Sequence, residues 1–168
     1  IIMETPENLS IILVPRSIVK DVRMFMRDYA EVNELIDGEE SPDDYIARAV
    51  IDAVAEFNTV APVCKAGEIA YSRLVQLDFV VRKIIIDLTV ARLLESVTIW
   101  MQRNQISVAG GNITENLNDK WQNYAGIIQR LKYGGGNGTD GAVAEASRLK
   151  EKANHTSAWG WIPTQLYN

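Results

Sequence analysis

Residues 74–103 constrain the fold of this chain more than any other stretch, because thirty positions pass without a Gly or a Pro and are apolar on most sides. Short pieces such as KIIIDLTV also suit a buried strand, but an uninterrupted run of this length favours a helix. Asp78 with Arg82, and Lys83 with Asp87, are spaced i,i+4 and support a helix as well. A helix with so little polar surface is either central in its domain or also covered by a partner chain.

Composition narrows the class of protein. The charged residues within this apolar stretch argue against a membrane span, and no signal-peptide pattern is visible. The 168 residues are enough for one domain with a core. A net charge of −5 makes the chain a poor general binder of nucleic acid, although it would suit the wall of a passage to which DNA must not adhere.

Four further helices are predicted from apolar spacing and end signals. One follows Ser17 as cap, with a stripe that includes Phe25, and carries basic residues outside. The next opens at Ser41 and Pro42 and stops at Pro62. Another runs from an Asn112–Glu115 capping box to Gly134, with Leu117, Trp121, Tyr124, Ile128 and Leu131 on one stripe. The last, over 142–154, is weakly amphipathic.

These elements predict an all-α protein, a bundle of about four helices followed by a flexible Gly-rich hinge and a C-terminal arm. The expected divisions are an N-terminal arm over 1–16, a helical bundle domain over 17–133, a hinge over 134–141, and a C-terminal helix with an aromatic tail over 142–168.

The glycine stretch has two competing interpretations. It holds five of the chain's eleven glycines: Gly134, Gly135, Gly136, Gly138 and Gly141. A dinucleotide fingerprint needs a strand before it and an acid about twenty residues later, and a phosphate loop needs Lys-Ser or Lys-Thr after its last glycine. A helical pattern precedes this stretch, Ala142-Val143 follows it, and no acid stands at the required distance. We therefore expect a flexible linker between helices.

Candidate catalytic groups are sparse. His155 has one carboxylate, Glu151, at i−4 and no second cluster for a metal. Cys64 is the sole cysteine, which rules out an internal disulfide and fits a reducing compartment. Adjacent acids such as Asp43-Asp44 do not share a helix face and serve capping better than acid–base chemistry. We expect no catalytic, cofactor-binding or metal site, and hence no enzyme.

The end of the sequence is unusually rich in large apolar residues: Trp159, Trp161, Ile162, Leu166 and Tyr167. Protein interfaces favour aromatic anchors of this kind. Two alternatives stay open, because the tail either folds back on its own core or inserts into a partner.

Three segments together resemble the head-to-tail adaptor proteins of tailed bacteriophages, also called connector or head-completion proteins. They are VRMFMRDY over 22–29, SPDDYIARAVIDAVAEFNTVAP over 41–62, and ARLLESVTIWMQRN over 91–104. The similarity covers about residues 17–133 and has no catalytic signature. The glycine stretch, the last helix and the Trp-rich tail exceed what a minimal adaptor needs.

The resemblance implies a structural virion protein of the phage neck. It would form a dodecameric homo-oligomeric ring at the capsid–tail junction, joining the portal protein to the next neck or tail protein. DNA would pass through the ring without specific binding, no membrane would be involved, and the chain would be made in the host cytoplasm. The alternative is a cellular all-helical interaction module that binds one partner through its aromatic tail.

Overall fold

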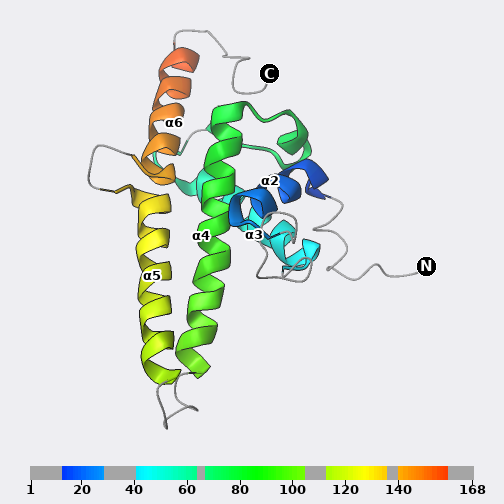
Figure 1. Ribbon diagram of the computed structural model, residues 1–168. Coiled ribbons are helices and arrows are strands. Elements are labelled where there is room, and N and C mark those ends of the chain that lie inside the picture. Colours follow the sequence, from blue (N-terminus) through cyan, green and yellow to red (C-terminus); the bar gives the residue numbers. More distant parts are fainter. Residues whose placement is uncertain (1–12, 29–40, 64–66, 105–112, 136–139, 159–168) are drawn as a thin grey trace, which may run out of the picture.

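The computed structural model describes residues 13–28, 41–63, 67–104, 113–135 and 140–158, with side chains except at 101, 103–104, 113–121 and 156–158. Every regular element in these ranges is a helix (Figure 1). In chain order the elements are α2 (Arg16–Met26), α3 (Asp43–Thr59), the 3-10 helix η2 (Tyr71–Gln76), α4 (Phe79–Asn104), α5 (Ile113–Tyr133) and α6 (Ala142–Ala158). The predicted all-α bundle is thereby confirmed.

Helix α4 is the central element, because α2, α3, α5 and α6 all contact it. Its first half is buried at Val81, Ile84, Ile85, Leu88 and Ala91. The prediction that this helix starts at Leu74 is wrong. The chain forms η2 first, and Asp78 then begins α4 by accepting a hydrogen bond from the Val80 amide at its carboxylate (3.3 Å). An aspartate at this position caps a helix and so separates the two elements.

Helices α2 and α3 confirm two of the predicted apolar stripes in most positions. Ile18 and Val22 are buried on α2, and Ile46, Ala49, Val50, Ala53 and Phe57 are buried on α3. The caps differ by one or two residues, since Pro15 precedes α2 where Ser17 was expected, and Pro42 stands before α3 rather than within it. Phe25, expected in the buried stripe, is 53% exposed.

The glycine loop connects α5 to α6, and the two helices follow one another along the same side of α4 (Figure 1). Helix α5 ends as predicted at Gly134, which has φ 92° and whose amide donates to the Arg130 carbonyl at 3.0 Å. A backbone bridge between Gly134 and Asp140 closes the base of the loop. At Gly141 the backbones cross so closely that a Cβ would clash with the Gly134 nitrogen.

Helix α6 is packed into the bundle rather than held away from it. Ala142 and Ala146 belong to the buried core, and Lys150 is 1% exposed. The Lys150 ammonium donates to the carbonyls of Asn58 and Val60, both at 2.8 Å, and lies 5.2 Å from the centre of the Phe57 ring. These carbonyls belong to the end of α3, where helices attract cations. The helical part of the expected C-terminal arm therefore stabilises α3.

Candidate interaction surfaces

The second half of α4 and the facing part of α5 form a two-helix hairpin that extends beyond α2 and α3 (Figure 1). Two helices alone cannot enclose a core, so apolar side chains on the hairpin remain in solvent. We define the hairpin surface by the exposed residues Val97, Ile99, Trp100 and Ile127. Trp100 is 63% exposed and lies one turn from Val97, on the same side of α4. Ile99 points about 100° away from Trp100, so apolar residues are exposed on more than one side of the hairpin.

A network of four charges fixes the base of the hairpin to α3. The Lys132 ammonium of α5 lies 3.0 Å from Glu56 of α3 and 2.8 Å from Glu95 of α4. Arg92 of α4 contacts the same two carboxylates, at 3.0 Å and 3.2 Å. Burial lowers the pKa of Lys132, but the hydrogen bonds to Glu95 and Glu56 outweigh it, so the pKa is raised from the ordinary 10.5. The network thereby fixes the hairpin relative to the bundle.

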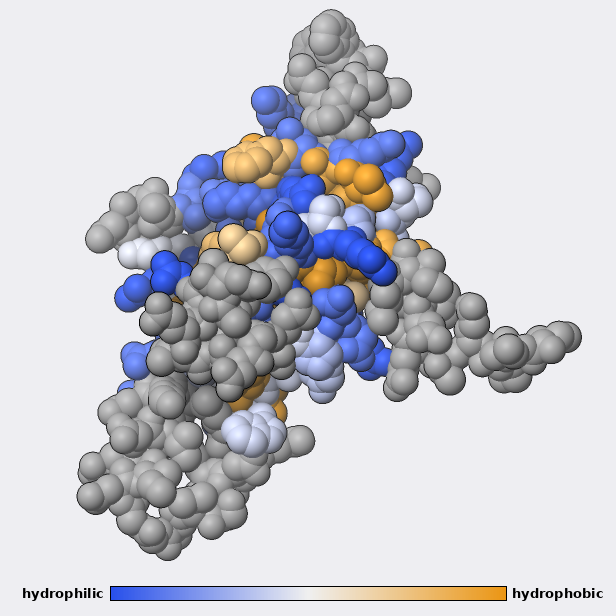
Figure 2. Space-filling model, turned by 45° about the vertical axis from the view of Figure 1, so that its right-hand side comes forward, coloured by the Kyte–Doolittle hydropathy of each residue, from blue (hydrophilic) through white to orange (hydrophobic). Residues whose placement is uncertain are grey.

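A second apolar surface lies at the opposite end of α4. Here α2 and α4 bound a groove of about 620 Å³ whose apolar lining is Met24, Phe25, Phe79 and Ile86. We call these four residues the groove surface. Phe79 is 79% exposed, the largest value among the exposed large apolar residues that the structure describes. Figure 2, turned so that the right-hand side of Figure 1 comes forward, shows hydrophobic residues lying between hydrophilic ones.

One ion pair joins the two walls of this groove, and a second lies within the α4 wall. Arg82 of α4 contacts the Asp21 carboxylate of α2 at 2.6 Å, instead of the Asp78 partner that the i,i+4 spacing predicted. The predicted pair of Lys83 with Asp87 is present at 2.9 Å, and this hydrogen bond raises the pKa of Lys83. All four charged groups that line the groove therefore have partners of opposite charge.

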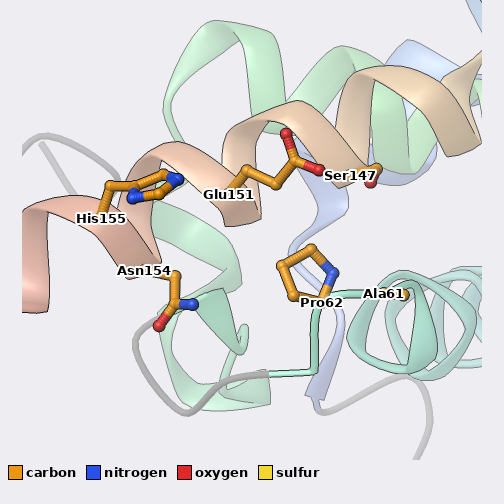
Figure 3. A pocket seen from close by; sticks show the side chains of 6 residues that line it. All are labelled: Ala61, Pro62, Ser147, Glu151, Asn154 and His155. Carbon is orange, nitrogen blue, oxygen red and sulfur yellow. The ribbon is translucent and has the colours of Figure 1, made fainter.

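A third hollow, of about 390 Å³, lies between α6 and the turn after α3. Figure 3 shows Ser147, Glu151, Asn154 and His155 on α6 facing Ala61 and Pro62. One imidazole and one carboxylate do not make a metal site. Across the described residues, no three His, Cys, Asp or Glu side chains form a group that could hold a metal ion.

Several predicted site residues lie outside the described residues, namely Cys64, Gly136, Gly138 and the whole tail set Trp159, Trp161, Ile162, Leu166 and Tyr167. Both fates of the tail stay open. Gly134, Gly135 and Gly141 of the expected hinge are described. The hinge stays a prediction, but a swing of α6 about it would break the Gly134–Asp140 bridge and remove α6 from the core.

The sequence did not single out the two surfaces on α4. Helical spacing placed Phe25 in a buried stripe and treated the apolar stretch of α4 as uniform. The sequence did contain a signal, because the α4 stretch has more apolar residues than one helix in a small bundle can bury. The first expected alternative, a central helix, is confirmed for the first half of α4. Coverage of the second half by a partner stays a prediction.

Comparisons with known proteins identify no relative. No family model matches the sequence, no curated protein matches it, and no solved structure matches the fold. In the described part of the chain, no helix combines the length and apolar character needed to cross a membrane.

Replacing Lys132 by Met tests the hairpin anchor. Removal of the ammonium leaves Glu56 and Glu95 to Arg92 alone, so we expect a loss of about 1–2 kcal/mol in the free energy of unfolding. The raised pKa of Lys132 sets the pH dependence, because the stabilisation is complete below pH 10.5 and is lost as pH rises through the higher folded value. Urea unfolding of both proteins, at neutral and at strongly alkaline pH, measures this.

The matched control is Arg148→Met. The Arg148 side chain is 66% exposed and its partner Asp140 is 37% exposed, so water screens this pair, and we expect a change of less than about 1 kcal/mol. If the difference in unfolding free energy between the parent protein and Lys132→Met increased at alkaline pH, the stabilising role of the Lys132 ammonium would be contradicted.

Proposed function

We propose that this chain is a non-enzymatic structural subunit of a protein ring, of the tailed-phage adaptor kind that its sequence resembles. In this proposal the ring joins the portal protein to the next neck or tail protein at the capsid–tail junction. The chain is made in the host cytoplasm and functions in the virion. The aromatic tail residues around Trp159 and Trp161 contribute to partner binding.

One observation carries the proposal: a single helix exposes apolar residues at both ends. Phe79 and Trp100 are 21 residues apart on α4, which corresponds to about 30 Å at 1.5 Å per residue. Exposed apolar patches of this kind mark interaction sites. Two different patches on one chain suit a head-to-tail contact, in which each copy uses one patch on each neighbour. Such contacts form a ring when the rotation between copies closes.

Charge supports the DNA channel in the same proposal. A wall that bound the phosphate backbone would hold the genome, since each Lys or Arg that contacts a phosphate adds affinity. The chain has 22 Asp and Glu against 17 Lys and Arg, and this excess of negative charge favours passage over binding.

Native mass spectrometry and negative-stain electron microscopy of the full chain test the proposal. The chain would be measured alone and with the portal protein encoded in the same genome. We expect a ring of one copy number, twelve by the resemblance, alone or on the portal. A chain that stays monomeric at micromolar concentration in both samples would refute the ring. A stable one-to-one complex with a host protein would favour the cellular interaction module instead.

A further inference from the structure

We infer that the groove surface of one copy receives the hairpin surface of the next copy. This inference rests on the proposed ring and specifies its subunit contact. The groove lies between two helices and has four apolar residues in its lining, and such a groove accepts the apolar side of another helix. The hairpin is the part of the described chain that extends beyond the bundle as a helix pair (Figure 1).

A hairpin that occupies the groove must come from another molecule. Phe79, in the groove, and Trp100, on the hairpin, belong to the same uninterrupted helix. A continuous α-helix keeps its two ends apart, here by about 30 Å, so a chain cannot place its own hairpin in its own groove. A second copy satisfies both surfaces at once, and each further copy repeats the contact.

The charges inside the groove favour an uncharged, apolar occupant. Arg82 and Lys83 are already paired with Asp21 and Asp87, so a partner need not supply counter-charges when it covers them. Interface cores are depleted of charge in the same way. An occupant that carried its own ions into this groove would have to give up their hydration without gaining new partners.

The hairpin surface matches this requirement on its α4 side. Ser96 and Val97 lie one turn before Trp100, share its side of the helix, and are exposed and uncharged. The nearest charged residues of α4 before Trp100 are Arg92 and Glu95, which pair with each other at 3.2 Å in the network at the hairpin base. The next charged residue of α4, Arg103, stands one turn after Trp100. The stretch from Ser96 to Trp100 therefore brings no charge to a groove that needs no counter-charge.

The contact joins different surfaces of the two copies. It is therefore distinct from a twofold contact, which pairs each surface with itself and closes after two copies. Each copy in the ring would present its groove surface to one neighbour and its hairpin surface to the other. This difference gives the two arrangements different cross-linking patterns.

Cross-linking between two singly labelled chains tests the contact. Met24→Cys marks the groove and Val97→Cys marks the hairpin, each in a Cys64→Ser background that contains no other cysteine. The rings are assembled as found for the proposed function, from an equal mixture of the two variants, and treated with a short bismaleimide. We expect a cross-linked dimer from the mixture and none from either variant alone. The control pairs Val97→Cys with Arg148→Cys, which is exposed on α6 and should not react.

Introduced charges provide a second measurement. Both Met24 and Val97 are exposed in the single chain, so Met24→Lys and Val97→Glu should leave the fold unchanged. Each alone would place an unpaired charge in the contact and should weaken association about tenfold or more. The double variant brings the lysine of one copy to the glutamate of the next. It should associate at least about threefold more tightly than the weaker single variant.

The outcomes separate this contact from the ring itself. Rings that form but give no cross-link between positions 24 and 97, or that cross-link 24 to 24, overturn this contact and leave the proposed function intact. A double variant that associates no better than the weaker single variant also counts against it. Absence of any ring, with or without the portal protein, overturns both.

Discussion

Replacing Arg23 by Met is expected to destabilise the fold by about 3–5 kcal/mol, the largest effect of any single substitution considered for this chain. The Arg23 side chain is 2% exposed and lies 2.8 Å from the Asp28 carboxylate, which is 4% exposed. Met keeps much of the volume but removes the charge, so the Asp28 carboxylate stays buried without this cation. Chemical denaturation followed by far-UV circular dichroism gives the free energy of unfolding.

Two further variants separate charge burial from simple loss of an ion pair. Arg82→Met removes a pair that is 26% and 42% exposed, and we expect a cost of at most about 1 kcal/mol. Adding Asp28→Asn to Arg23→Met removes the buried negative charge as well and should recover part of the loss. If Arg23→Met cost no more than Arg82→Met, burial of the Arg23–Asp28 pair would not be what makes its loss costly.

The second large effect is expected from Gly141→Ala, at about 3 kcal/mol. The new Cβ would lie well inside contact distance of the nitrogens of Gly134 and Tyr133, and 2.5 Å from the Lys132 carbonyl carbon. All three atoms are backbone, so no side chain can rotate away and the crossing of the chain must open. The melting temperature should fall by several degrees, since each kcal/mol shifts it by about 2–4 °C at this size.

Gly126→Ala is the matched control, with the opposite sign. Gly126 lies within α5, is exposed, and has no atom within 4 Å of an added Cβ. Alanine there lowers the entropy of the unfolded chain without a clash, and we expect a gain of about 0.5–1 kcal/mol. Equal effects of the two substitutions would show that the crossing at Gly141 is looser than the structure has it.

The helices and several of their ends could be predicted from the sequence, because apolar spacing and capping act between residues that are close in the chain. Apolar spacing identified the stripes of α2 and α3, and Gly134 ended α5 where a glycine with positive φ was expected. The start of α4 was misplaced for a local reason as well. Asp78 was interpreted as the partner of Arg82 four residues on, whereas it caps the helix and Arg82 contacts Asp21.

The interaction surfaces depend on which helices reach which part of α4, and spacing along one helix does not contain that information. The apolar spacing around Phe25 and Phe79 is the same as around buried residues. Both are exposed because no other element of the described structure covers that end of the bundle. The placement of α6 also depends on distant contacts. Its weak apolar pattern gave no reason to expect that alanines such as Ala146 would fill the core.

The contact of Lys150 with the end of α3 has a consequence for the order in which the protein matures during translation. The ammonium and the Asn58 carbonyl that it binds are separated by 92 positions in the chain. Ribosomes deliver the N-terminal helices first, so α3 emerges with these carbonyls facing water until the later α6 has been made. Completion of this end of the bundle is thereby delayed until α6 has left the exit tunnel, and a nascent chain cannot acquire its finished surface early.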